Sequence, residues 1–299
     1  MEIQKEKIIY HYIYDPKKYS GRMFDQFLAM GWYRMKQKIF TTTHNQYGNG
    51  PENINRVWWL RYNVNELSAH DSHKRLKRKS ARFEITIEKF HDNSLEELDL
   101  YDIYRSDIDF DGYESLNEYL YGGEKMSSKY NTYAIRIKDN SKLIAVGLFD
   151  KGLDSVASGI HFYDHSYSKY SLGKLLILKT VEFLKENNMQ WYYPGYIVVG
   201  KPKLDYKLFL GKDKAQYFDY ESKSWLGYKD EILIPESYTL DDFDLFGLSI
   251  LFSRFGNMTP KDIKELMRGI DQSSIEEINN NDAQTNYPSD TLNNIEDIY

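Results

Sequence analysis

The order of hydrophobic and polar residues predicts a β-hairpin and a third strand in the middle of the chain. Two apolar runs, Tyr133–Lys138 and Leu143–Phe149, flank the polar turn Asp139–Lys142. That arrangement is typical of two antiparallel strands joined by a tight turn. Val156–Tyr163 follows with the same two-residue period, which predicts a further strand.

A long apolar helix is predicted directly after these strands. Ser171–Asn187 is strongly apolar along its length, and Trp191–Val199 has the composition of a strand. A strand, a helix and a second strand in succession indicate a crossover connection, with the helix packed on a sheet. The pattern alone therefore predicts an α/β or α+β core between about residues 135 and 210.

The N-terminal part also alternates between helix and strand. Met23–Phe40 predicts an amphipathic helix that ends at Gly31 and is followed by a strand. Val57–Tyr62 and Arg82–Phe90 are predicted as strands, the second with clean alternation of apolar and polar residues. Residues 91–129 carry acidic residues and tyrosines at helical spacing, and we expect helices there.

The two ends of the chain are less regular. Residues 1–20 are expected to be a loosely structured lead. Ala215–Tyr220 and Glu231–Pro235 are predicted as a strand pair. Thr259, followed by proline and an acid, has the signature of a helix start. From Gln272 the chain is polar, rich in asparagine and acidic, which predicts a disordered tail.

Composition narrows the classes of function. The chain has 299 residues and no cysteine, which excludes disulfides, thiolate metal sites and a cysteine nucleophile. The sequence has no apolar run long enough to span a membrane and no secretory signal at its N-terminus, so we expect a cytoplasmic protein. Its formal net charge of −6 argues against a general nucleic-acid binder. His70 and His73 lie three residues apart without a third ligand, and no metal site is predicted.

Positive charge is nevertheless concentrated in one place. Six of the nine residues between Lys74 and Arg82 are Lys or Arg. A helix of this density could contact a phosphate backbone, with Trp58, Trp59 and Tyr62 as stacking partners for unpaired bases. Taken without other indications, a solvated helix is the simpler interpretation.

The junction between the third strand and the long helix is the strongest local feature. The strand ends at Tyr163-Asp164, and the helix begins at Ser171-Leu172-Gly173-Lys174. Free N–H groups at a helix start can bind phosphate or a carbonyl oxygen. Acyltransferases of the GNAT type place coenzyme A there, over a loop with two glycines, whereas this chain has only Gly173. Glycine chosen for packing is the alternative, and His161 is interpreted as a polar partner within the sheet.

Several short motifs occur in a fixed order, and together they resemble a known family. They are Phe162-Tyr163-Asp164, Ser171-Leu172-Gly173-Lys174, Tyr192-Tyr193-Pro194-Gly195-Tyr196-Ile197 and Lys201-Pro202-Lys203-Leu204-Asp205-Tyr206-Lys207. This order is similar to the C-terminal signature of arginyl-tRNA–protein transferases and bacterial leucyl-tRNA–protein transferases. The resemblance extends over about residues 22–240 and is closest between 160 and 210. The family's N-terminal cysteine cluster is missing, and Lys201 stands where many members have cysteine.

The resemblance implies a fold and a division of the chain. The fold is a GNAT-like acyltransferase core, a mixed sheet with flanking helices, preceded by a smaller α/β region. The implied domains are an N-terminal α/β region with the basic segment (1–130), a GNAT-like transferase domain (131–255) and a short helix with an acidic tail (256–299).

The resemblance also implies an activity. The chain would transfer arginine or leucine from aminoacyl-tRNA to the N-terminal α-amine of an acceptor protein, whose first residue is acidic if it follows the family. Charged tRNA and acceptor N-termini would be its partners, with no cofactor and no membrane, and the oligomeric state stays open. Two alternatives are an acetyl-CoA-dependent N-acetyltransferase and a non-catalytic relative that binds tRNA or peptide.

Residue roles follow from the same resemblance. Asp164, Tyr163 and Gly173 would act in catalysis, with Asp164 as a base or an amine-orienting group and the N–H groups near Leu172 and Gly173 facing an oxyanion or a phosphate. The residues expected to bind the substrates are Leu172, Tyr196, Lys203, Tyr206 and Lys207, with the two lysines at the acceptor end of tRNA. The residues expected to contact the body of tRNA are Lys74, Arg75, Lys77, Arg78 and Arg82.

Overall fold

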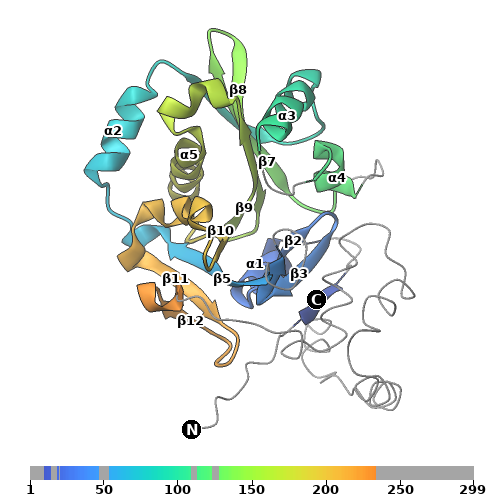
Figure 1. The fold of residues 1–299 in the computed structure, drawn as a ribbon, viewed down its shortest axis with the longest axis vertical. Coiled ribbons are helices and arrows are strands. Elements are labelled where there is room, and N and C mark those ends of the chain that lie inside the picture. The colour runs from blue at the N-terminus through green and yellow to red at the C-terminus, as the bar shows by residue number, and fades with distance from the viewer. Residues whose placement is uncertain are drawn as a thin grey trace. The chain divides into compact units, whose positions relative to one another are not determined.

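A large mixed β-sheet organises the part of the chain that the computed structural model describes, which comprises residues 10–14, 19, 21–46, 54–108, 113–122 and 128–233 (Figure 1). The strand order is β12-β11-β5-β10-β9-β8-β7-β6, and β4 pairs with β5. Its strands are β4 (His44–Gln46), β5 (Ile54–Asn63), β6 (Glu84–Lys89), β7 (Thr132–Asp139), β8 (Lys142–Lys151), β9 (Ser155–Tyr163), β10 (Trp191–Val198), β11 (Ala215–Asp219) and β12 (Ser224–Gly227). The mixed α/β fold class with flanking helices is therefore confirmed.

The predicted hairpin and the strand after it are confirmed. β7 and β8 pair antiparallel and are joined through Asn140 and Ser141, whose φ angles are 48° and 70°. Two consecutive residues with positive φ form the turn whose twist matches that of paired strands. β9 pairs antiparallel with β8, and β10 then lies parallel to β9.

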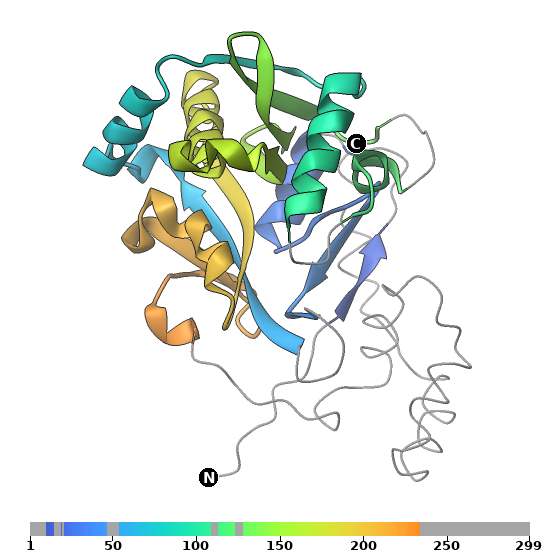
Figure 2. The ribbon, with the colours of Figure 1, turned by 45° about the horizontal axis from the view of Figure 1, so that its top comes forward.

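Helices cover both faces of strands β7–β9 (Figures 1 and 2). The described part of the chain contains the helices α1 (Gly21–Ala29), α2 (Asp71–Lys79), α3 (Leu95–Asp107), α4 (Leu116–Tyr121) and α5 (Leu172–Glu186), of which α3, α4 and α5 pack on these strands. α5 packs with Ala145 and Phe149 of β8 in one cluster, while α3 and α4 pack with Val146 and Leu148 of the same strand in another. Because neighbouring side chains of a strand point to opposite faces, the two clusters lie on opposite sides of the sheet. Short 3-10 helices connect the elements: η2 (Val64–Glu66), η3 (His165–Tyr170), η4 (Pro202–Leu210), η5 (Lys212–Lys214) and η6 (Asp230–Leu233).

The N-terminal region forms a second, three-stranded sheet in the order β1-β3-β2. Its strands are β1 (Tyr10–Tyr14), β2 (Tyr33–Met35) and β3 (Lys38–Thr42). The single strand predicted after Gly31 is wrong, because Lys36, at a φ of 57°, turns the chain and makes a hairpin. The loose lead predicted for residues 1–20 is wrong at Tyr10–Tyr14, which pairs with β3.

The strand pair predicted near the end is confirmed in its first member only. β11 coincides with Ala215–Tyr220, but its partner is β12, reached through a turn in which Lys223 has a φ of 51°. Glu231 lies in the 3-10 helix η6 and not in a strand. The predicted helix start at Thr259 and the predicted tail lie outside the described residues.

The described residues all belong to one unit that spans Met1–Phe243. Strands β5 and β6 precede residue 130 and β7 follows it, and all three belong to the same sheet. The division into 1–130, 131–255 and 256–299 stays a prediction. Of the helices in the described residues, none combines the length and the apolar character needed to cross a membrane.

A buried ion pair joins the small sheet to the large one. Arg34 on β2 lies 2.9 Å from Asp150 on β8, and the side chains are 5% and 3% exposed. The same guanidinium donates to the carbonyl oxygen of Leu120 at 2.8 Å and to Thr132 Oγ1 at 3.1 Å. Its carbon lies 4.5 Å from the ring centroid of Tyr130, at the range of a cation–π contact. Arg34 therefore bonds to β7, β8 and α4 at once.

Replacing Arg34 by alanine should leave the Asp150 carboxylate buried without its partner. We expect the free energy of unfolding to fall by about 3–5 kcal/mol, the range for breaking a buried pair on one side. Urea unfolding followed by the fluorescence of the five tryptophans would measure it. Lys36→Ala is the matched control, because the Lys36–Glu118 pair is 38% and 31% exposed, and it should cost less than about 1 kcal/mol. Equal losses in both variants would contradict the assignment.

Candidate active site

Strands β9 and β10 begin as neighbours and then separate. Their last paired residues are Ala157 and Tyr193, after which the rest of β9 pairs with β8 and the rest of β10 pairs with β5. Pro194 follows the last pair and has no N–H to donate to a ladder. Gly195 comes next at a φ of 91°, where the register of β10 against β5 also shifts. The sequence Pro-Gly thus ends the parallel pairing at a defined point.

The 3-10 helix η4 brings Tyr206 and Lys207 to this point. Lys207 Nζ donates to the carbonyl oxygen of Tyr196 on β10 at 2.6 Å. A Cβ atom placed on Gly195 would lie 3.9 Å from the same Nζ. The Lys207 carbonyl oxygen in turn accepts from the hydroxyl of Tyr62 on β5 at 3.0 Å. Lys207 is therefore held on both sides where the strands separate.

The charge of Lys207 has little local compensation. Burial lowers the pKa of Lys207 to about 8, and the negative charge of Asp205 opposes that shift only in part. Within the described ranges Lys207 makes no ion pair. A negatively charged ligand would therefore stabilise the charged form of this lysine.

His161 lies on β9 beside this lysine. It faces Gly147 of β8, where a Cβ atom would lie 3.1 Å from His161 Cδ2, so that a larger residue there would press on the ring. The Nδ1 atom is buried and has no hydrogen-bond partner in the residues that the structure describes. Burial, and secondly the charge of Lys207, lower the pKa of His161 to about 4. The ring is therefore neutral at physiological pH, with one nitrogen available to a ligand.

Three tyrosines complete the group. The rings of Tyr163, from β9, and Tyr104, from α3, lie 5.8 Å apart, and Lys207 Nζ lies 5.8 Å from the ring of Tyr206. Burial, and secondly the proximity of Tyr163, raise the pKa of Tyr206 to about 12. The hydroxyls of all three have no hydrogen-bond partner among the described residues. We call His161, Lys207 and these tyrosines the Lys207 cluster.

Asp164 follows β9 directly and is heavily bonded. Its carboxylate accepts from Lys142 Nζ at 2.7 Å and from the backbone N–H of Ser166 at 2.9 Å, and it caps η3. Burial acts to raise the pKa of Asp164, but the hydrogen bonds from Lys142 and Ser166 outweigh it and lower the pKa overall. Asp164 is thus an ionised, weakly basic carboxylate.

The start of α5 lies beyond Asp164. Ser171 has a φ of 52° and makes no side-chain cap, so the first N–H groups of α5 depend on other partners. The Leu172 side chain is 1% exposed and belongs to the core, which leaves only its backbone for a ligand. A Cβ atom at Gly173 would meet only Tyr163 Cε1, at 3.7 Å. Close packing does not require glycine here, and Gly173 borders a ring of the Lys207 cluster.

The structure brings only part of the predicted site together. Tyr163, Tyr206 and Lys207 meet. The ring of Tyr196 also lies 5.2 Å from Lys207 Nζ, but its hydroxyl turns to the other side and accepts from Asn45 Nδ2 at 2.7 Å. Lys203 lies exposed on η4, four residues before Lys207.

His161 and Tyr104 are the two members of the Lys207 cluster that sequence analysis did not assign to the site. His161 precedes the Phe-Tyr-Asp motif and was the nearest signal, whereas nothing in α3 pointed to Tyr104. Among the described residues, no three His, Asp or Glu side chains lie together as ligands for a metal ion.

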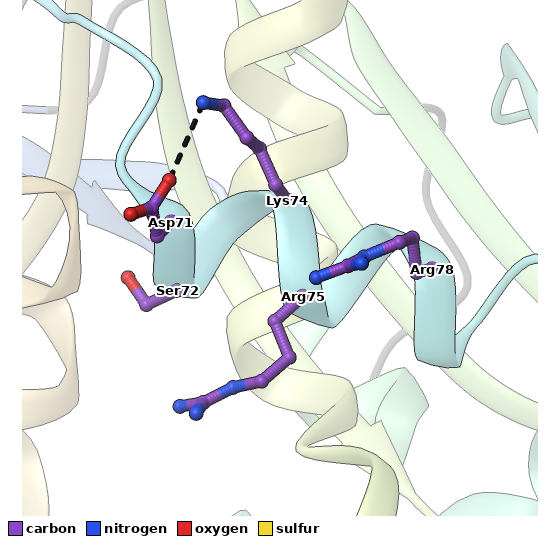
Figure 3. A pocket seen from close by; sticks show the side chains of 5 residues that line it. All are labelled: Asp71, Ser72, Lys74, Arg75 and Arg78. Atoms are coloured by element: carbon purple, nitrogen blue, oxygen red, sulfur yellow. Dashed lines mark hydrogen bonds and ion pairs between the residues drawn. The ribbon is translucent and has the colours of Figure 1, made fainter.

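The basic segment is a helix docked on the core. His73 and Leu76 of α2 are buried, and His73 Nε2 lies 3.1 Å from the carbonyl oxygen of Phe209 on η4. A pocket of about 590 Å³ on the outer side of α2 is lined by Asp71, Ser72, Lys74, Arg75 and Arg78. Figure 3 shows these side chains extending from the helix around this pocket.

The cations of this segment differ in their partners. Lys74 pairs with Asp71 at 3.3 Å, Lys77 with Glu182 on α5, and Arg82, beyond the end of α2, with Asp139. Arg75 and Arg78 make no ion pair in the described part of the chain. Two of the five predicted RNA-contact residues thus keep their charge uncompensated.

The predicted stacking partners are mostly wrong. Trp59 is 2% exposed and stacks on Tyr33 at 3.8 Å, and Tyr62 is fully buried. Trp58 is half-buried, and its indole N–H donates to the carbonyl oxygen of Ile232. β5 is a central strand, so Trp59 and Tyr62 fill the core and cannot stack on bases.

Comparison with known proteins gives this geometry a family context. The family described as arginine-tRNA-protein transferase, C terminus, matches residues 96–215. An aspartate/glutamate leucyltransferase of Helicobacter hepaticus is 28% identical over 189 residues, covering 60% of this chain and 73% of that protein. Arginyl-tRNA–protein transferase 1 of Saccharomyces cerevisiae is 38% identical over 72 residues, covering 24% of this chain and 14% of that protein.

Among solved structures, L-PGS from Bacillus licheniformis is similar with a TM-score of 0.35 and 11% identity, over 58% of this chain and 50% of that one. This overlap is too low to define a shared fold. The matching segment 96–215 contains α3, the separating strands, the start of α5 and the whole Lys207 cluster. The resemblance in the motifs is confirmed: this segment is similar to the C-terminal part of arginyl-tRNA–protein transferases, and a longer stretch of the chain is similar to a bacterial aspartate/glutamate leucyltransferase.

Proposed function

We propose that this chain transfers an amino acid, arginine or leucine, from aminoacyl-tRNA to the N-terminal α-amine of an acceptor protein. The observation that carries the proposal is the position of the family motifs. Tyr163 lies far in the sequence from the adjacent residues Tyr206 and Lys207, yet the three meet where β9 and β10 separate. The names of the related leucyltransferase and arginyltransferase support the same reaction.

The reaction places modest demands on the protein. The amine attacks the ester carbonyl of aminoacyl-tRNA, a tetrahedral oxyanion forms, and the 3′-terminal ribose oxygen leaves as the amide is made. Because the ester is already activated, no enzyme nucleophile is needed. The protein has to orient the two substrates, accept a proton from the amine and stabilise the oxyanion. No cofactor is part of this scheme.

Asp164 and the start of α5, both next to the Lys207 cluster, each meet one of these requirements. Of the two roles predicted for Asp164, the low pKa of its carboxylate and its bonds to Lys142 and Ser166 favour orientation of the amine over proton removal. The uncapped first turn of α5 at Leu172 and Gly173 supplies N–H groups for an oxyanion or a terminal phosphate.

A GNAT-like core is part of the proposal. Three features support such a core. The parallel strands β9 and β10 separate beside the start of a helix, α5 is the crossover between them, and antiparallel strands precede it. Coenzyme A-dependent N-acetylation is the alternative for the same fold. Gly173 as the only glycine in the Ser171–Lys174 turn argues against the usual pyrophosphate loop and favours aminoacyl-tRNA as donor.

Arg75 and Arg78 are the proposed contacts of the tRNA backbone. Both guanidinium groups are uncompensated and line one open pocket, which suits phosphodiester groups. Lys74, Lys77 and Arg82 already have acidic partners, and their contribution is proposed to be smaller. Lys203, exposed on η4, is the proposed contact of the acceptor end. A cytoplasmic location, with protein N-termini and charged tRNA as partners, completes the proposal.

A transfer assay tests the function directly. The full chain is mixed with tRNA charged with arginine, leucine or another amino acid, and with peptides that begin with Asp, Glu, Arg or Lys. We expect a mass increase of one aminoacyl residue for at least one pair, and none with uncharged tRNA or an N-acetylated peptide. Tight binding of charged tRNA without transfer to any peptide would contradict an enzyme and favour a binding protein. Saturable coenzyme A binding would favour the acetyltransferase.

Gly173 provides a test of the site's position. Gly173→Trp should abolish transfer, since an indole would fill the space beside Tyr163 and the first turn of α5. Gly173→Ala is the matched control and should stay within a few-fold of the unchanged protein, because a Cβ atom there meets only Tyr163 at 3.7 Å. Rates of transfer and thermal unfolding are measured for both. Full activity of a folded Gly173→Trp variant would contradict this placement.

The arginines of α2 have a salt-dependent signature. For the double variant Arg75→Ala, Arg78→Ala we expect weaker binding of charged tRNA, and a slope of log affinity against log salt that is shallower by about 1 to 2 units. The reason is that each arginine bound to a phosphate displaces about one counterion from the RNA, and the variant displaces correspondingly fewer. Lys77→Met is the comparison and should change the slope less, because Glu182 already neutralises Lys77. An unchanged slope in the double variant would contradict the proposed role of these arginines.

A further inference from the structure

Transfer requires a group that accepts a proton from the acceptor's amine, and the residues in and next to the Lys207 cluster are poor proton acceptors at neutral pH. Against the effect of burial, hydrogen bonds hold the pKa of the Asp164 carboxyl below its ordinary value, and burial lowers the pKa of His161 to about 4. Burial lowers the pKa of Lys207 to about 8, so this side chain is charged, and burial raises the pKa of Tyr206 to about 12, so its hydroxyl keeps its proton. A further residue is therefore needed for this step.

His165 begins η3 and lies against two rings of the Lys207 cluster. Its ring centroid lies 5.2 Å from that of Tyr163 and 5.6 Å from that of Tyr104, edge to face in both cases. Gly173, at the start of α5, borders the same ring of Tyr163, because a Cβ atom there would lie 3.7 Å from Tyr163 Cε1. His165 and the first N–H groups of α5 thus border one tyrosine ring, and a substrate bound at that ring could contact both.

An acidic side chain lies beside one nitrogen of this histidine. The Oδ2 atom of Asp107, at the end of α3, is 3.3 Å from His165 Nδ1. A carboxylate at Nδ1 favours the tautomer in which Nε2 carries the lone pair, and it stabilises the imidazolium that forms when Nε2 accepts a proton. Nε2 itself has no hydrogen-bond partner in the described ranges, and the side chain is 32% exposed, so a substrate can reach it. The pair has the arrangement of a base and its orienting group.

We propose that His165 is the proton acceptor of the transfer reaction and that Asp107 positions it. The inference rests on the proposed transfer function and names a catalytic residue for it. Nε2 takes a proton from the α-amine as the amine nitrogen attacks the ester carbonyl carbon, and the carbonyl electron pair moves to oxygen to form the oxyanion. When the oxyanion collapses, the ester C–O bond breaks and the imidazolium gives the proton to the leaving ribose oxygen. His165 is neutral again, and no further reactant is needed.

The test measures kcat and KM with the charged tRNA and the peptide that support transfer. His165→Gln should lower kcat by about 10²- to 10⁴-fold, the usual contribution of a general acid or base, while KM for both substrates stays within a few-fold. His165→Phe keeps a ring against Tyr104 and Tyr163 and should lose as much, whereas a role in packing alone would leave it active. His91→Gln is the matched loss of an exposed histidine, in the loop after β6, and should keep the full rate.

Added imidazole provides a second measurement that a structural role would not change. His165→Ala leaves space beside Tyr163 in which free imidazole can take up the proton. Imidazole in the buffer should therefore restore part of the rate of this variant, and it should not raise the rate of the unchanged protein or of His91→Ala. This measurement keeps the test decisive if His165→Gln or His165→Phe fails to fold. Thermal unfolding of each variant shows which proteins are folded.

A double-mutant cycle tests the role of Asp107. Asp107→Asn should lower kcat by about 10- to 100-fold, the value of one bond to a charged group, because Nδ1 loses its charged partner. The same change in the His165→Gln background should have no further effect, since Asp107 acts only through the imidazole. Asp102→Asn, an exposed acid on the same helix, is the matched control and should leave both rates unchanged. Equal losses from Asp107→Asn in both backgrounds would contradict its positioning role.

The outcomes separate this inference from the function on which it rests. No transfer by the unchanged protein with any charged tRNA would overturn the transferase proposal, and the role of His165 with it. Transfer by the unchanged protein together with a nearly unchanged kcat in folded His165→Gln would overturn only the role of His165. A His165→Gln variant that raises KM and keeps kcat would assign the residue to substrate binding, and it would overturn the inference as well.

Discussion

The need to satisfy backbone hydrogen bonds where β9 and β10 part shapes everything around the site. Pro194 cannot donate, and Gly195 turns away at positive φ, so the parallel ladder ends in the middle of a sheet. The polar groups freed there require other partners. The carbonyl oxygen of Tyr196 obtains one from Lys207, and η4, which carries that lysine, is tied to β5 through Tyr62. One break in a ladder thus explains why a charged side chain lies half-buried between strands.

The electrostatics of the site follow from that position. Removed from water, the Lys207 ammonium loses hydration, and its charge disfavours a second cation on His161. The same burial keeps the tyrosine hydroxyls protonated and available as donors. Asp164 lies a few residues from His161 in the sequence, but there the charged form is favoured. Hydrogen bonds from Lys142 and Ser166 stabilise its carboxylate and lower its pKa. A donor-rich cluster and a stabilised carboxylate therefore lie at the two ends of a short stretch of chain that completes β9.

Local sequence patterns determine the structure in the middle of the chain. The hairpin β7–β8, the strand β9, the helix α5 and the strand β10 were all predicted, because each has a strong period and a turn signal of its own. The predictions were poorer where contacts between distant parts of the chain determine whether a side chain is buried. Trp59 and Tyr62 look like exposed aromatics beside a basic run, but β5 pairs with β10 and β11 and is central.

The candidate site shows the same division. Tyr163, Tyr206 and Lys207 could be named because family motifs mark them, whereas Tyr104 reaches the site from α3 through packing alone. Ion pairing is equally invisible in a sequence. Lys77 and Arg78 are neighbours of the same charge, yet only Lys77 faces an acid on α5.

The way α2 is docked has a consequence for motion within the molecule. His73 contacts the backbone of η4 at Phe209, two residues from Lys207, Lys77 bonds to α5, and Lys79 bonds to the carbonyl oxygen of Lys169 on η3. These three connections join the helix to both segments that border the separating strands. A tilt or slide of α2 would therefore break its bonds to η3, α5 and η4, which connects the position of the outer basic surface to that of the segment that carries the inner lysine.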